Sequence, residues 1–89
     1  MAKSYDSKQF TVTGTNFFNY SAFNKGISTF TVKNGAAAVN LFLGDTDKPA
    51  IPLAINEVYT FSGPFESLHL QVVSGATTSV VQVIEFPKY

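Results

Sequence analysis

The sequence predicts an all-β protein, a small antiparallel β-sandwich or jelly-roll-like barrel of about seven strands. Apolar and polar residues alternate with a period of two, and β-branched and aromatic residues dominate the alternating segments. Turn signals separate these segments at short intervals, which is typical of sandwiches and small barrels. With 89 residues and no cysteine, the chain is expected to form one domain, 1–89, without disulfides.

Each expected strand is a short alternating run bounded by turn residues. In chain order the strands are Lys8–Thr13, Ile27–Lys33, Ala36–Leu43, Ala50–Leu53, Val58–Ser62, Ser67–Val73 and Ser79–Phe86. Turns are expected at Asn34-Gly35, "GDTDKP", Ile55-Asn56-Glu57, "SGPF" and "SGATT". Residues 1–12 are expected to form either an extended N-terminal arm or the first strand.

Two hairpins follow from these turns. Asn34-Gly35 predicts a type I′ turn that pairs Phe30 with Val39 on the core face and places Ile27 opposite Phe42 on the solvent face. A second hairpin through "SGATT" pairs Leu68 with Val83 and Leu70 with Val81 inward. Extending that second register sets Glu66 opposite Glu85, where like charges predict fraying or a bulge.

The charge content indicates which classes of partner the protein is expected to bind. Charged residues are 13% of the chain, against about 25% in an ordinary soluble protein. Six lysines balance six carboxylates and arginine is absent, so no basic stripe is available and direct nucleic-acid binding is not expected. A net charge of zero gives weak repulsion between copies and favours association.

The same composition gives no sign of a membrane or secretory segment. No apolar run reaches the length that spans a bilayer, and "MAKSYDSKQF" lacks the apolar core of a signal peptide. The protein is therefore expected to be made in a cytoplasm and to have no membrane partner.

Candidate catalytic and metal-binding residues are few. His69 is the single histidine, lies mid-strand on a face expected to point outward, and has only Ser67 nearby on that face. Asp45 and Asp47 in "GDTDKP" resemble part of a calcium loop, but an Asp-rich turn that caps its own backbone explains them more simply. We therefore expect no enzyme activity, no metal and no cofactor.

The aromatic stretch "TGTNFFNYSAFNKG" at residues 13–26 leaves three interpretations open. In the first interpretation, its rings pack inside the sandwich and close one end of the core. In the second, they form an association surface, because aromatic residues are enriched and charged residues are depleted at such surfaces. A third interpretation is sugar recognition, with rings stacking on a glycan and Asn amides bonding its hydroxyls. For the association surface, the expected contact set is Phe17, Phe18, Tyr20, Phe23, Ile27 and Phe42.

Residues 27–86 carry a resemblance to a known class. The segments "FTVKNGAAAVNLFLG" and "PAIPLAINEVYTFSGPFESLHLQVVSGATTSVVQVIEF" resemble the small all-β virion proteins of tailed phages, of the capsid cement or decoration type. The resemblance implies a β-sandwich or jelly roll that forms dimers or trimers on a capsid lattice. It supplies no individual site residues.

The expected function is therefore that of a non-enzymatic virion structural protein, which decorates or cements a capsid by bridging neighbouring subunits. Its expected partners are copies of itself and a larger shell protein, and its expected location is the virion. The alternative is a carbohydrate-binding or host-recognition module, such as a head-fibre, tail or adhesin component, whose partner would be a glycan.

Overall fold

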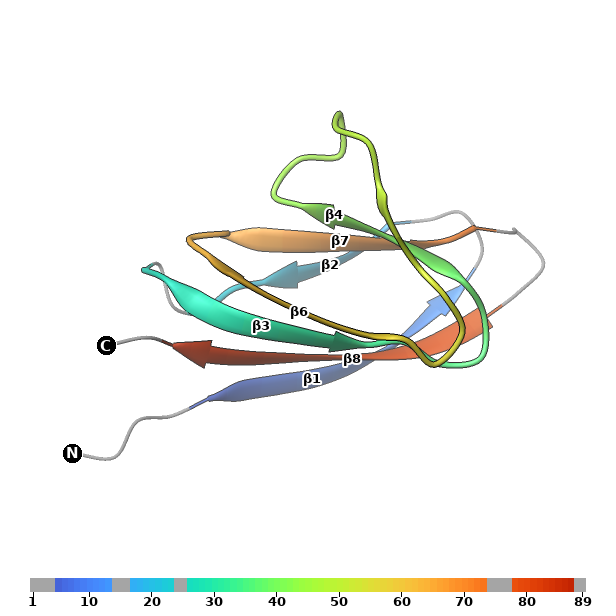
Figure 1. The fold of residues 1–89 in the computed structure, drawn as a ribbon, viewed down its shortest axis with the longest axis horizontal. Helices are drawn as coiled ribbons and strands as arrows, with labels where there is room; N and C mark the ends of the chain where they lie inside the picture. The colour runs from blue at the N-terminus through green and yellow to red at the C-terminus, as the bar shows by residue number, and fades with distance from the viewer. Residues whose placement is uncertain (1–4, 14–16, 24–25, 74–77, 88–89) are drawn as a thin grey trace.

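Eight strands form two four-stranded antiparallel sheets that pack face to face, as the upper and lower layers of Figure 1 show. The structure, a computed structural model, describes residues 5–13, 17–23, 26–73 and 78–87. The strands are β1 (Asp6–Thr13), β2 (Phe18–Ser21), β3 (Ser28–Lys33), β4 (Val39–Leu43), β5 (Ile51–Leu53), β6 (Val58–Gly63), β7 (Ser67–Val72) and β8 (Thr78–Pro87). Sheet A has the order β1-β8-β3-β6 and sheet B the order β2-β7-β4-β5. This is the strand order of a jelly roll, so the predicted fold class is confirmed.

The predicted strands are all present, and one strand was missed. β1 begins at Asp6, so residues 6–12 of the N-terminal segment belong to the first strand. β2 lies inside the aromatic stretch 13–26, where no strand was predicted, and it pairs with β7 through four residues. Its alternation spans only four residues, at the short limit of a strand signal, which is why periodicity did not find it.

The predicted β3–β4 hairpin is wrong. β3 pairs with β6 and β8 in sheet A, whereas β4 pairs with β5 and β7 in sheet B. Neither Asn34 nor Gly35 has the positive φ that a type I′ turn requires. The segment crosses between the sheets instead, so Ile27 is not paired with Phe42.

Asn34 and Gly35 brace this crossing. The Asn34 side-chain amide donates to the carbonyls of Ala37, Leu53 and Ala54, and its oxygen accepts from the Ser79 hydroxyl at 2.8 Å. Gly35 lies so close to β8 that a Cβ added to it would be 2.5 Å from the Val80 carbonyl oxygen. The Asn-Gly pair is therefore needed for a buried crossing rather than for a tight turn.

The predicted β7–β8 hairpin is wrong for the same reason. β7 lies between β2 and β4, and β8 lies between β1 and β3. Glu85 is opposite Asp6 on β1 and not opposite Glu66, and residues 74–77 of the expected turn lie outside the described residues. The inward faces were nevertheless predicted correctly.

The core fills the space between the sheets with the inward residues of both. Its fully buried members include Phe30, Leu41, Leu53, Leu68, Leu70, Val81 and Val83. Phe30 stacks on Phe61 with ring centroids 5.2 Å apart, and Phe65 packs against both rings. These contacts fix β6 against β3 at one edge of sheet A.

A buried carboxylate ties the two sheets together near β2. Glu85 follows Val81 and Val83 on the inward face of β8 and is fully buried. It accepts hydrogen bonds from the Tyr20 hydroxyl at 2.8 Å, the Ser28 hydroxyl at 2.8 Å and the Phe23 N–H at 3.0 Å. The Tyr20 hydroxyl also lies 2.9 Å from Oδ2 of Asp6. Because Tyr20 belongs to sheet B and Glu85 to sheet A, this polar cluster bridges the layers.

The cluster predicts an alkaline limit to stability. Burial, followed by the hydrogen bond to Glu85, raises the pKa of Tyr20 far above its ordinary value of 10.0. The unfolded chain ionises this tyrosine above about pH 10 while the folded chain does not. The free energy of unfolding should therefore fall as pH rises above about 10, by up to about 1.4 kcal/mol per pH unit.

Urea unfolding of the wild type, Tyr20→Phe and Tyr5→Phe from about pH 8 to about pH 11 measures this effect. Tyr20→Phe should lower stability near neutral pH by about 1–3 kcal/mol and should remove the alkaline slope that this residue contributes. Tyr5 is exposed and serves as the matched control, whose replacement should leave the slope in place. An identical slope in the wild type and Tyr20→Phe would contradict the prediction.

Candidate association surface

The six aromatic and aliphatic residues of the expected contact set lie in three places. Phe17 and Phe42 meet on the outer side of sheet B, and Phe23 and Ile27 are exposed between β2 and β3. Phe18 is half-buried against the core, and Tyr20 is only 1% exposed. Tyr20 therefore packs inside the sandwich. Fewer residues are accessible to a partner than the expected contact set contains.

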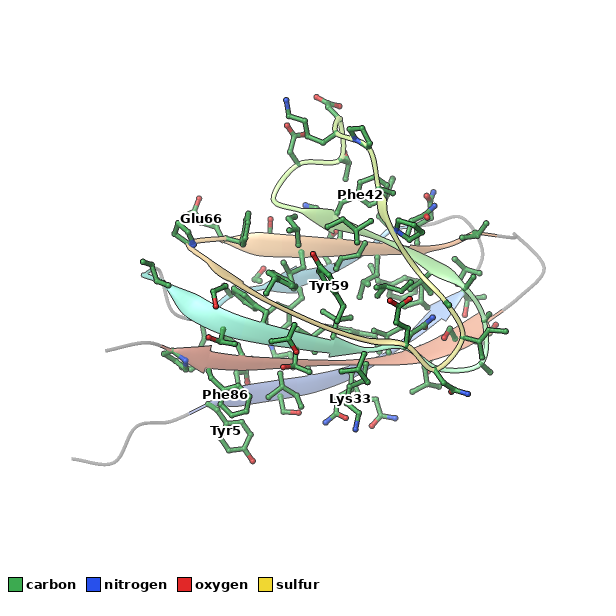
Figure 2. The ribbon with its side chains drawn as sticks, in the orientation of Figure 1. Tyr5, Lys33, Phe42, Tyr59, Glu66 and Phe86 are labelled. Atoms are coloured by element: carbon green, nitrogen blue, oxygen red, sulfur yellow. The ribbon has the colours of Figure 1, made fainter. Side chains whose placement is uncertain are left out.

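Phe17 and Phe42 form the aromatic pair on sheet B. Their rings meet edge to face with centroids 5.4 Å apart. Phe42 points away from the sandwich on β4, as Figure 2 shows, yet it is only 9% exposed. Phe17 is 44% exposed and carries most of the accessible surface of the pair. The pair places an apolar spot on a face whose other outward strand residues, apart from Pro52, are polar.

Phe23 is held in position by the buried cluster. Its backbone N–H donates to Glu85, and the N–H of the preceding Ala22 donates to the Glu66 carbonyl at 2.8 Å. These two bonds fix the backbone at Phe23 and at the residue before it, while the Phe23 side chain remains 46% exposed. The fold thus presents this ring to solvent from a rigid support.

A further exposed pair, Tyr5 and Phe86, was missed by the sequence analysis. Their rings stack with centroids 5.6 Å apart on the outer side of sheet A (Figure 2). Tyr5 precedes β1 and Phe86 is the penultimate residue of β8, and the antiparallel β1–β8 register brings these two ends together. The pair could be predicted only from the knowledge that β1 pairs with β8, because the two residues are far apart in sequence.

The outer faces of both sheets are nearly free of charge. The outward strand residues of sheet A are Ser7, Gln9, Thr11, Thr13, Thr29, Thr31, Lys33, Val58, Thr60, Ser62, Thr78, Val80, Gln82, Ile84 and Phe86. Lys33 is the one charged residue among them. In the described strands of sheet B, no outward residue is Asp, Glu, Lys or Arg. Acidic residues such as Asp45, Asp47, Glu57 and Glu66 lie in the connections instead.

His69 lies in a hydrogen-bonded row on sheet B. Its Nδ1 donates to Oδ1 of Asn19, and its Nε2 is 3.4 Å from the Ser67 hydroxyl. The sequence did not predict that Asn19 would contact His69, because Asn19 belongs to the strand that periodicity missed. The row has the order of a nucleophile, a base and an orienting group. However, strand N–H groups point along the sheet and not above it, so these strands supply no oxyanion donors over Ser67.

The acidic turn "GDTDKP" behaves as a backbone cap. The Asp47 N–H donates to Oδ1 of Asp45 at 2.9 Å, as the simpler interpretation predicted. Among the described residues, no three His, Cys, Asp or Glu side chains are grouped to hold a metal ion. The same part of the chain contains no helix long and apolar enough to cross a membrane.

Comparison with known proteins shows the fold and no family. No protein-family model and no curated protein matches the sequence. One similar structure is an HTH_3 family transcriptional regulator from Vibrio cholerae, with a TM-score of 0.68 and 14% identity over 96% of this chain. That match covers 44% of the regulator, so this chain spans less than half of its length. A second is a subunit of the Bacillus endospore appendages, described as disulfide-linked pili, with a TM-score of 0.55 and 12% identity over 100% of this chain and 93% of that one.

Proposed function

We propose that this protein is a non-enzymatic structural subunit that associates with copies of itself and decorates or cements a larger protein shell, as a virion component. The observation that carries the proposal is the nearly uncharged outer surface of both sheets. Outer faces rich in Thr, Ser, Val and aromatic residues suit burial against another protein, because their burial leaves few charged groups without water.

Exposed rings add specific anchors to these faces. Phe17, Phe23, Tyr5 and Phe86 are each at least 44% exposed, and hydrogen bonds or ring contacts hold each of them in place. Rigid aromatic side chains lose little conformational entropy on binding and are enriched among the residues that dominate interface energies. A partner would therefore find preformed anchors on both sides of the sandwich.

The fold is compatible with this proposal. Jelly rolls occur in viral capsid proteins and also in lectins and cupins, so fold alone does not fix function. The appendage subunit from Bacillus is a polymerising protein of similar fold across nearly its full length. This chain has no cysteine, so its copies must associate without the disulfide links of those pili.

Replacing Phe17 tests the surface on sheet B. Phe17→Ser should weaken association with the shell protein or with other copies by about tenfold or more, because it removes an exposed aromatic anchor. The free energy of unfolding should change little, since Phe17 lies at the rim of the structure. Copurification with the native assembly and sedimentation of the purified protein measure the two forms of association.

Ile55→Ser is the matched control, because Ile55 is an apolar residue of the β5–β6 turn that is 59% exposed and does not belong to the Phe17–Phe42 pair. An equal weakening of association in the two variants would show that general surface hydrophobicity, and not the Phe17–Phe42 pair, controls association. Unfolding of Phe17→Ser would show that the ring supports the fold rather than a partner.

A second candidate function is sugar recognition by the same face. The exposed Phe17 ring lies on the side of sheet B that also carries the Asn19 amide and the His69 ring. This combination offers a stacking surface beside hydrogen-bonding groups. A glycan array distinguishes the functions: specific glycan binding that Phe17→Ser abolishes would favour sugar recognition, and its absence together with self-association would favour the structural subunit.

A further inference from the structure

The two sheets end in four edge strands, and these edges are not equivalent. β1 and β6 are the edges of sheet A, and β2 and β5 are the edges of sheet B. An edge strand presents backbone N–H and C=O groups that can pair with a strand of another chain. Proteins that stay monomeric block such edges with short strands, proline or charged residues that point inward.

Three of the four edges are blocked in these ways. β1 carries Asp6 and Lys8 on the side that faces the other sheet. A strand of another chain that paired with β1 would therefore bury these two charged side chains beside the side chains of the added strand. β5 has three residues, and Pro52 at its centre lacks an N–H donor. β2 pairs through only four residues.

β6 lacks every one of these devices. It runs for six residues, Val58–Gly63, without a charge or a proline, and it pairs with β3 along its whole length. Its outward residues Val58, Thr60 and Ser62 are exposed, and its inward residues Tyr59 and Phe61 are half-buried at the rim of the core. Among the strands that the structure describes, β3 is its sole partner.

We propose that β6 pairs antiparallel with β6 of a second copy across a two-fold axis. The two A sheets would then form one continuous sheet of eight strands, four from each chain. This proposal rests on the self-association proposed above and names the surface that performs it. A two-fold contact uses the same strand on both chains and closes on itself, so it yields a dimer.

The sequence of β6 fits such a pairing in the register centred on Thr60. Residues on the same face must be opposite each other, so paired residue numbers have an even sum. Thr60 then lies opposite Thr60 of the second copy, where two hydroxyls can bond, and Tyr59 lies opposite Phe61 of the second copy, which covers both half-buried rings. The register shifted by one pair would place Tyr59 against Gly63, whose inner side is already filled by the Phe65 ring within 2.5 Å of an added Cβ.

Charges around β6 are compatible with this register. Glu57 precedes the strand and would be opposite Gly63 of the second copy, so no carboxylate faces another. Lys33 lies on the neighbouring strand opposite Val58 and is separated from the contact by one strand. The pairing therefore buries no charged side chain and opposes no like charges, whereas a β1–β1 contact would bury Asp6 and Lys8.

A charge placed on the two-fold axis tests the proposal. Thr60→Lys sets two ammonium groups opposite each other and should raise the dimer dissociation constant by about tenfold or more. Thr60→Asp should do the same. An equimolar mixture of the two variants should recover the dimer, because lysine then faces aspartate. Thr11→Lys, an exposed outward residue of the opposite edge strand β1, is the matched control and should dimerise like the wild type.

Light scattering gives the mass of each sample, and far-UV circular dichroism confirms that each variant is folded. Hydrogen exchange of the wild type should show β6 amides that become protected as concentration rises. Association of Thr60→Lys at wild-type strength, or failure of the mixture to recover the dimer, would overturn the β6 contact while leaving self-association intact. A wild type that remains monomeric would instead overturn the proposed self-association itself.

Discussion

Glu85→Ala is expected to lower the free energy of unfolding by about 3–5 kcal/mol, the largest loss among the substitutions considered. The carboxylate is fully buried and accepts hydrogen bonds from Tyr20, Ser28 and the Phe23 N–H. Alanine would remove this shared acceptor and leave a cavity between the sheets. Because small domains are stable by only about 5–15 kcal/mol, such a loss would leave the protein close to unfolding.

Urea unfolding of Glu85→Ala, Glu85→Gln and Glu66→Ala measures the effect. Glu85→Gln keeps the shape and one acceptor oxygen, so its loss should be smaller than that of Glu85→Ala. Glu66 is exposed in the β6–β7 connection, and its side chain is not part of the cluster, so its replacement should leave stability unchanged. A loss below about 1 kcal/mol for Glu85→Ala would show that the cluster does not tie the sheets together.

Gly35→Ala should lower the free energy of unfolding by about 2–4 kcal/mol, which is the second of the two largest expected effects. The new Cβ would lie 2.5 Å from the Val80 carbonyl oxygen and 3.2 Å from the Ser79 hydroxyl oxygen. Since the closest atom belongs to the backbone of a central strand, it cannot rotate away. The crossing segment would have to shift, and the hydrogen bond from the Gly35 N–H to Ser79 would lengthen.

Gly44→Ala provides the contrast for this prediction. Gly44 has a φ of 77°, and an added Cβ there would meet nothing closer than a Phe65 carbon at 4.0 Å. Its replacement should cost only the backbone strain of about 1–2 kcal/mol. Thermal unfolding of both variants tests the distinction, and a smaller loss for Gly35→Ala than for Gly44→Ala would contradict the close approach to β8.

The sequence predicted which side chains face inward, but not which strands pair. Alternation placed Leu68, Leu70, Val81 and Val83 in the core, and all four are fully buried. Alternation within a strand carries no information about its partner, so the hairpins had to be inferred from local turns. Asn34-Gly35 is a strong hairpin signal, yet the Asn34 amide donates to the carbonyls of Leu53 and Ala54 and braces a crossing between the sheets instead.

The candidate surface was predictable only in part. Low charge and exposed rings such as Phe17 follow from composition and position, and the structure places Phe17 and Phe23 at the surface. Tyr20 differs because the acceptor that draws its hydroxyl inward, Glu85, lies 65 residues away in sequence. The unprotected state of β6 could not be predicted either, since an edge is defined by the strand order of the whole sheet.

The central claim is that other copies of the chain cover the uncharged faces and the open β6 edge. Analytical ultracentrifugation of the full chain over a concentration series from about 1 µM to about 1 mM tests this claim most directly. The account predicts a mass that rises with concentration from 9.7 kDa to at least that of a dimer. A constant mass of 9.7 kDa across the whole series would contradict it.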